Sequence, residues 1–401
     1  MLRRQRLSSI DRAGAASGVA AEERVVTLFE LTEAEEAIQR VIRDFATREI
    51  APHSDAWDEA GALPLHVFQR LGELGVFGLA FPADLGGNDG GLVAYCLALE
   101  ELGKVDASVS ITVEAAVTLA GKPLHWFGTP AQQRDYLVPL AQGEAIGAFG
   151  LTEPRGGSDT AGLATRAVRD GDDWVINGGK CFITNAGTPI SKFVIVAART
   201  GEKAITNFIV PRDTPGYELA PPYHKLGWRA SDTRELTFTD CRVPDDLRLG
   251  ETGNGLRQFL TVLEEGRVAV AAMSVGQAQG SLDQTIAYAK ERVQFGKPII
   301  EHQAVGFRLA DLATEIEAAR ALTYLTARRR MSGQPVKTEA AMAKLFASEV
   351  AQKAAVIGVN VFGGYGFMAE TPISRFYRDA PVLTIGEGTS DILKLVISRA
   401  L

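Results

Sequence analysis

A carboxylate placed between two glycines is the feature of this sequence best suited to chemistry. Glu387 lies between Gly386 and Gly388 in the segment TIGEGTSDI. Glycine adopts backbone conformations closed to other residues, so we expect a tight bend that directs the carboxylate inward. Burial would raise the pKa of this carboxyl group, and the N-terminus of a following helix would lower it. The segment therefore indicates a general base near neutral pH, although a lone loop glutamate is more often solvated.

Two segments of the middle of the chain also carry residues suited to ligand contact. In AFGLTEPRGGSD, residues 148–159, a β-rich run meets a turn that offers backbone N–H groups and the hydroxyls of Thr152 and Ser158. Turn chemistry alone favours a plain hairpin turn there. In INGGKCFITNAG, residues 176–187, aromatic and hydroxyl side chains could wall a flat heterocycle, whereas alone the segment indicates only a strand.

A third segment, ERVQFGKPIIEHQ at residues 291–303, links two predicted helices. It contains polar side chains that could contact phosphates or a nucleotide: Arg292, Gln294, His302 and Gln303. A solvated connection between the helices is the simpler interpretation. No GxGxxG follows a strand, so a Rossmann nucleotide site is not indicated.

The elements that must position these residues follow the order helical, β, helical. A capping box of Thr32 and Glu35 begins an amphipathic helix that Pro52 ends, and helical patterns recur over 65–74, 92–102 and 108–120. Short β-rich runs between about 146 and 243 predict an antiparallel sheet or barrel. Long Ala-rich stripes after about 256 predict an up-and-down bundle, and Thr389 and Ser390 offer an N-cap to a closing helix over 391–399.

Composition excludes several classes of function. The 401 residues are 46% hydrophobic and 23% charged, with a net charge of −7, so a nucleic-acid backbone is an unsuitable partner. The three cysteines lie far apart without CxxC spacing, which argues against a disulfide framework or a metal site. No apolar run reaches the ~18 residues that a membrane span needs. We expect a disordered tail over residues 1–30 rather than a mitochondrial transit peptide, and the Arg-over-Lys bias favours a bacterial cytoplasmic protein.

Several motifs, in order from about Leu31 to Leu401, resemble the acyl-CoA dehydrogenase family. They are LTEPRGGSD, FITNAG, RVQFGKPIIEHQ, FGGYGF and GEGTSDI. The resemblance implies a mainly α fold with a middle β-domain: a tail over 1–30, an N-terminal helical domain over 31–145, a middle β-domain over 146–250 and a C-terminal four-helix bundle over 251–401. It also implies a homotetramer.

The resemblance further implies FAD, an acyl-CoA substrate and an electron-transfer flavoprotein as acceptor. Glu387 would remove the pro-R α-proton while the β-hydrogen leaves as hydride to flavin N5, giving a trans-2-enoyl-CoA. The backbone N–H at Glu387 and a ribityl hydroxyl of FAD would stabilise the enolate character of the thioester.

Motif matches assign roles to individual residues. Ser158, Arg267, Glu387 and Gly388 would contact the substrate, and some family members place their base one residue before that arginine, where this chain has Gly266. The residues that would hold the cofactor are Phe149, Leu151, Thr152, Ser158, Phe182, Ile183, Thr184, Arg292, Gln294, His302, Gln303, Gly363, Gly364, Gly388, Thr389 and Ser390.

Departures from the family pattern bear on the substrate. Gly386 replaces a bulky aromatic and Phe182 replaces a tryptophan, which together predict a wider acyl pocket for short or branched chains. The segment 105–117 lacks the arginine expected for a dicarboxylyl substrate, and Arg155 either reaches a CoA phosphate or points to solvent. An acyl-CoA oxidase using O2 and a catalytically silent FAD or acyl-CoA binding protein are the alternatives.

Overall fold

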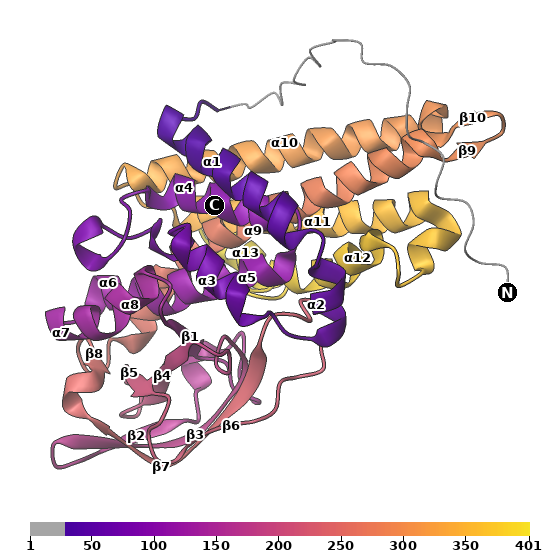
Figure 1. Cartoon of the computed structure of the whole chain (residues 1–401). Coiled ribbons are helices and arrows are strands. Elements are labelled where there is room, and N and C mark those ends of the chain that lie inside the picture. Colours follow the sequence, from indigo (N-terminus) through magenta and orange to yellow (C-terminus); the bar gives the residue numbers. More distant parts are fainter. Residues whose placement is uncertain (1–28) are drawn as a thin grey trace, which may run out of the picture.

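The computed structural model describes residues 29–401 of the chain, so nearly all of the tail predicted over residues 1–30 lies outside the described residues. Figure 1 shows three regions: short helices from the first part of the chain, a twisted sheet, and long helices from the last part. The predicted fold class, mainly α with a middle β-domain, is confirmed.

The first region begins at the predicted capping box. The Thr32 hydroxyl accepts a hydrogen bond from the Glu35 backbone N–H at 3.3 Å, and the Glu35 carboxylate accepts one from the Thr32 N–H at 2.9 Å. These bonds satisfy two N–H groups that a helix start would leave unpaired. The helices are α1 (Glu33–Phe45), η1 (Ala46–Ile50), α2 (Ser54–Ala60), α3 (Leu65–Glu73), η2 (Val76–Gly78), η3 (Ala83–Leu85), α4 (Gly91–Gly103), α5 (Ala107–Glu114), η4 (Ala115–Gly121), α6 (Lys122–Phe127), α7 (Pro130–Gln132), η5 (Gln133–Leu137) and α8 (Val138–Ala141).

The middle region is an eight-stranded sheet with the order β6-β7-β3-β2-β4-β5-β8, to which β1 adds by pairing with β4. Most strand pairs of this sheet are antiparallel, as predicted, but β1 and β2 each pair with β4 in parallel, which the sequence did not predict. The β2–β3 hairpin separates β1 from its partner along the chain, so β1 does not pair with the strand that follows it. The strands are β1 (Ile146–Gly150), β2 (Arg166–Asp170), β3 (Asp173–Thr184), β4 (Ser191–Arg199), β5 (Ile205–Pro211), β6 (Tyr217–Leu219), β7 (Thr233–Pro244) and β8 (Arg248–Leu249), with the turns η6 (Thr160–Gly162) and η7 (Asp245–Leu247).

The last region is dominated by three long helices that lie side by side in Figure 1. Helix α9 packs against α11 and α10 and also against α4, so the first and last regions share one interface. The buried apolar residues of one cluster come from all three regions. The elements are α9 (Gly255–Glu291), the hairpin β9 (Val293–Gln294) and β10 (Lys297–Pro298), η8 (Ile299–Glu301), α10 (Gln303–Met331), α11 (Lys337–Phe362), η9 (Gly363–Phe367), α12 (Pro372–Leu383) and α13 (Ser390–Ser398).

One helical stretch, Lys337–Phe367, is long and apolar enough to cross a membrane by length and composition. Half of its most apolar window is buried within the protein. Because α11 packs against α9, α10, α12 and α13, its buried apolar residues belong to the core of the bundle.

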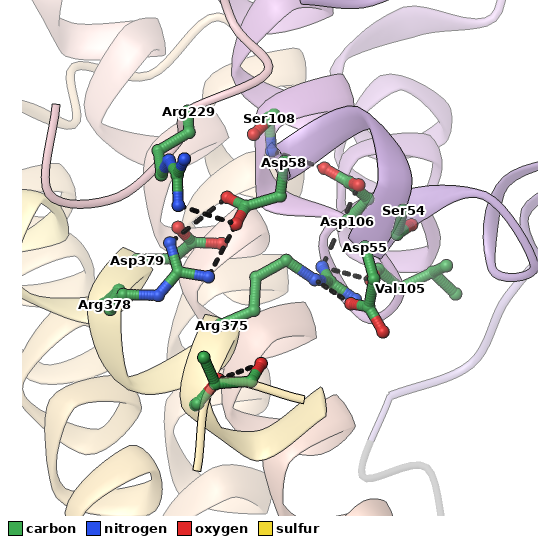
Figure 2. Close-up of polar contacts among 12 residues, drawn as sticks. Ser54, Asp55, Asp58, Val105, Asp106, Ser108, Arg229, Arg375, Arg378 and Asp379 are labelled. Atoms are coloured by element: carbon green, nitrogen blue, oxygen red, sulfur yellow. Dashed lines mark hydrogen bonds and ion pairs between the residues drawn. The ribbon is translucent and has the colours of Figure 1, made fainter. Parts of the chain in front are cut away.

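An ion-pair network ties the three regions together near the start of the segment that carries Glu387 (Figure 2). Asp58 of α2 is buried and forms ion pairs with two arginines that are distant in the sequence. Its Oδ2 lies 2.6 Å from Nη2 of Arg378 in α12 and 3.5 Å from Nη1 of Arg229 in the loop between β6 and β7. One carboxylate therefore joins an early helix, a loop of the sheet region and a late helix.

The same helix α12 makes a second set of polar contacts through Asp379, next to Arg378, and Arg375, one turn before it. The buried Asp379 accepts a hydrogen bond from the Trp228 backbone N–H at 2.6 Å, and the Arg375 Nε donates to Asp55 at 3.1 Å. Nη1 of Arg375 also lies 3.8 Å from the buried Asp106, which caps α5 (Figure 2). These contacts fix α12 before the chain enters the loop toward Glu387.

Candidate active site

The loop between α12 and α13, residues 384–389, carries Glu387. The backbone N–H of Ser390 donates to the Thr384 carbonyl at 3.1 Å and closes this loop. Thr389 is the N-cap of α13, and its side chain accepts a hydrogen bond from the Ile392 N–H at 3.3 Å. The closing helix therefore begins at Ser390, next to the predicted Asp391, for the predicted reason.

The bend in this loop does not arise from both flanking glycines as the sequence suggested. Glu387 itself has φ 55° and Gly388 has φ 103°, whereas Gly386 is outside the left-handed region. A Cβ added at Gly386 would come no closer than 3.6 Å, to the Val382 carbonyl. A non-glycine residue in this region costs about 1 kcal/mol or more, so the surrounding contacts must hold Glu387 in place.

Helix α9 provides the wall against which the Glu387 carboxylate lies. A Cβ added at Gly266 would sit 2.2 Å from Glu387 Oε2 and 2.9 Å from its Cδ. No side chain fits at position 266 while Glu387 keeps this conformation. Gly266 cannot act as a base itself, and its missing side chain leaves the space that the Glu387 carboxylate occupies.

The Glu387 carboxylate is enclosed by protein, and neither of its oxygens has a hydrogen-bond partner within residues 29–401. Burial raises the pKa of this carboxyl to about 7. The positive charges of Arg267 and then Lys344 act in the opposite direction and lower the pKa. Arg267 follows Gly266 on α9 and is itself buried. A carboxyl group with these properties is half ionised near neutral pH and has free lone pairs for a proton.

A second buried carboxyl group, Glu114 at the end of α5, interacts electrostatically with Glu387. Glu114 is fully buried, and neither carboxylate oxygen has a hydrogen-bond partner among the described residues. Burial and then the charge of Glu387 hold its pKa well above the usual range. Sequence reasoning missed Glu114, although it is the single charged residue between Asp106 and Lys122 in an otherwise uncharged helical run.

The two β-domain segments that the sequence singled out are joined to each other. Buried Lys180 in β3 donates from Nζ to the Leu151 carbonyl at 3.1 Å and to Glu153 at 2.7 Å. The Cys181 N–H donates to the Thr152 carbonyl at 2.9 Å. The segment 148–159 is therefore held across β3 and is not an isolated hairpin turn.

The side chains predicted to face a flavin differ in exposure. Phe149, Leu151 and Ile183 are buried, Thr152 and Thr184 are half-buried, and Ser158 is exposed. Phe182 is 66% exposed, has φ 60°, and lies with its ring centroid 5.4 Å from that of Tyr223. A large aromatic side chain held exposed in a strained conformation is suited to contact a ligand or partner.

The remaining predicted residues gather at the far end of α9. Arg292, Gln294, Gly363 and Gly364 line one open groove of about 580 Å³, together with Tyr288, Ile299, Val361, Phe362, Tyr365 and Met368. His302 Nε2 lies 3.1 Å from the Gln294 carbonyl oxygen, and Gln303 begins α10 beside it. Gly266 and Arg292 are separated by about 39 Å of helix at 1.5 Å per residue. This groove and Glu387 are therefore distinct sites within one chain.

Comparison with known proteins decides the family. Models of the acyl-CoA dehydrogenase N-terminal, middle and C-terminal domains match residues 32–144, 148–241 and 253–401. The chain belongs to the acyl-CoA dehydrogenase family. As a member of this family it is an oxidoreductase that acts on acyl-CoA thioesters, which confirms the prediction from the sequence motifs.

Individual relatives cover nearly the whole chain. The probable acyl-CoA dehydrogenase YngJ of Bacillus subtilis is 46% identical over 93% of this chain and 99% of its own length. The caffeyl-CoA reductase–Etf complex subunit CarC of Acetobacterium woodii is 38% identical over 92% and 98%. The solved butyryl-CoA dehydrogenase of Megasphaera elsdenii is 39% identical, with a TM-score of 0.90 over 93% of this chain and 99% of that one.

Proposed function

We propose that this acyl-CoA dehydrogenase converts an acyl-CoA to its trans-2-enoyl-CoA with Glu387 as the base that removes the α-proton. The observation that carries the proposal is the enclosed, unpartnered Glu387 carboxylate, whose burial against Gly266 raises its pKa to about 7. A base of this kind can accept a proton at neutral pH without first breaking a hydrogen bond to the protein.

An α-proton of a thioester is too weakly acidic for a carboxylate acting alone. The reaction therefore needs hydrogen-bond donors at the thioester oxygen, where negative charge develops. The backbone N–H of Glu387 is the donor that we assign from this chain. Arg267, buried beside the base, favours the ionised form of Glu387, which is the form that accepts the proton.

We propose FAD as the cofactor, divided between the two groups of residues described above. The flat ring system would lie against two segments that hydrogen bonds hold together, where two half-buried threonines and one exposed aromatic side chain are available: Leu151, Thr152, Phe182, Ile183 and Thr184. The open space over the glycines of η9 and the nearby guanidinium group fit a dinucleotide phosphate: Gly363, Gly364 and Arg292. When bound, FAD accepts the β-hydrogen at N5.

The separation of these two groups along α9 supports a homotetramer in which the groove of one protomer completes the cofactor site of another. The side chains of Phe295 and Phe367 near this groove are 95% and 85% exposed, as expected for residues that another protomer covers. We also propose the division into domains at residues 31–145, 146–250 and 251–401, and a bacterial cytoplasmic location.

For the substrate we propose a short or branched acyl chain. Gly386 and the similarity to butyryl-CoA dehydrogenase of Megasphaera elsdenii support this choice. For the electron acceptor we propose an electron-transfer flavoprotein, supported by the similarity to the Etf complex subunit of Acetobacterium woodii. Steady H2O2 release during turnover in air would instead indicate the oxidase alternative.

The test is anaerobic reduction of the purified flavoprotein by a panel of acyl-CoAs of increasing length and branching. We expect short or branched substrates to bleach the flavin absorbance, and Glu387→Gln to reduce the rate by about 10³-fold or more while the protein still binds acyl-CoA. An undiminished rate in Glu387→Gln would exclude this residue as the base. No bleaching with any acyl-CoA would support the silent binding protein.

A further inference from the structure

A buried lysine on α11 contacts the loop that carries Glu387. The Lys344 side chain has 0% exposure, and its Nζ donates a hydrogen bond to the Gly388 carbonyl at 2.7 Å. Its nearest buried neighbours on the helix are four alanines and one serine: Ala340, Ala341, Ala343, Ala347 and Ser348. A lysine is rarely buried in such surroundings without a specific role.

Lys344 does not have the partner that usually stabilises a buried ammonium group. Within residues 29–401 no carboxylate oxygen lies within 4.0 Å of its Nζ. Burial lowers the pKa of this ammonium to about 8, and the charge of Arg267 adds to that effect while Glu387 and Glu349 oppose it. The hydrogen bond of Lys344 goes to the Gly388 carbonyl of the loop, and not to a carboxylate.

The bonded carbonyl belongs to the residue directly after the base. Glu387 and Gly388 form the left-handed bend, and the loop around them is otherwise closed by backbone bonds of its own, from Gly386 to Val382 and from Ser390 to Thr384. The bond from Lys344 is the tether that joins this bend to a long helix of the bundle. A bend with a conformational cost needs such a contact to stay populated.

We propose that Lys344 is a positioning residue, whose side chain holds the Gly388 carbonyl so that the bend directs the Glu387 carboxylate toward Gly266. The proposal rests on the proposed role of Glu387 as the base. The charge of Lys344 has a second effect, because a buried positive group favours the ionised form of a nearby carboxylate.

The charged and titratable groups that act on Glu387 come from several packed helices. Arg267 of α9 and Lys344 of α11 lower the pKa of Glu387, and Glu114 of α5 and Tyr95 of α4 interact with it. Replacing Lys344 by methionine keeps an unbranched side chain only one atom shorter and removes both the hydrogen bond and the charge. With only Arg267 left to favour the carboxylate, the pKa of Glu387 must rise.

The experiment compares wild type, Lys344→Met and Lys353→Met by the pH dependence of anaerobic flavin reduction. Lys353 lies on the same helix, is exposed and pairs with Glu315, so it is a matched control. In Lys344→Met we expect the apparent pKa of the limiting rate to rise by about one unit and the plateau rate to fall about tenfold. Lys353→Met should reproduce the wild-type profile.

A second readout reports the geometry without turnover. Amide hydrogen exchange of the peptide covering residues 384–390 should become faster in Lys344→Met and stay unchanged in Lys353→Met. If Lys344→Met does not fold, Lys344→Gln, which is shorter and uncharged, takes its place in both measurements. A lower unfolding temperature with an unchanged pH profile and unchanged exchange of the loop would overturn the proposal.

Glu387→Gln separates the two possible failures. If Glu387→Gln abolishes flavin reduction and Lys344→Met behaves as wild type, only the role of Lys344 is wrong. If Glu387→Gln reduces the flavin at the wild-type rate, the assignment of the base itself is wrong, whatever Lys344→Met shows.

Discussion

At the scale of single residues, Glu387 and Glu114 are two buried carboxyl groups that differ in the charges acting on them. The pKa of Glu387 is raised to about 7, where Arg267 and Lys344 offset part of the effect of burial. Burial and then the charge of Glu387 raise the pKa of Glu114 well above its usual range. The two groups titrate as a pair, and we expect Glu387, which has the positive charges of Arg267 and Lys344 acting on it, to lose its proton before Glu114.

This order predicts the pH dependence of catalysis. The limiting rate of flavin reduction should fall about tenfold per pH unit below pH 7 and level off above it, because only ionised Glu387 accepts the proton. Glu114→Gln should keep the inflection within a few tenths of a unit, since a neutral amide then replaces a neutral acid. A marked downward shift of the inflection in Glu114→Gln would mean that Glu114 is ionised in the native enzyme.

At the scale of elements, the loop after α12 contacts α9 where the Glu387 carboxylate lies against Gly266. Gly266→Ala would place a Cβ 2.2 Å from Glu387 Oε2, so the base must move. We expect about a 10²-fold loss of kcat with little change in unfolding temperature, because the displaced group is a side chain at the end of a loop. Rapid-mixing flavin reduction and thermal unfolding measure the two effects.

Gly386→Ala is the comparison from the loop itself. Its Cβ would lie 3.6 Å from the Val382 carbonyl, an ordinary contact, and its backbone is outside the left-handed region. We expect at most a several-fold change in rate with a short acyl-CoA. Equal losses in Gly266→Ala and Gly386→Ala would show that the loop, and not its contact with α9, controls the base.

At the scale of the whole molecule, Asp58 connects three distant parts of the chain. Asp58→Ala would leave the pairs with Arg378 and Arg229 unmade, and we expect a loss of about 2 kcal/mol in the free energy of unfolding. Asp44→Ala removes one partner of an exposed pair with Arg48, at 4.0 Å, and should change it by less than about 0.5 kcal/mol. Thermal or chemical denaturation distinguishes them, and equal stabilities would exclude Asp58 as a structural link.

Local patterns predicted what depends on nearby residues. The capping box at Thr32, the N-cap at Thr389 and the succession of helices, strands and helices each follow from spacing within one segment. The parallel pairing of β1 with β4, and the placing of Glu114 and Lys344 around Glu387, depend on segments brought together only in the folded chain. Residue periodicity carries no information on which distant helix will supply a neighbour.

The contact between Gly266 and Glu387 also limits how such a site can change during evolution. The space beside α9 holds one carboxylate, so an acidic residue at position 266 would collide with Glu387 before it could replace it. Loss of Glu387 first would leave a descendant without a base. Relocation of the base between these positions therefore requires paired substitutions, and the effects of the two changes cannot be additive.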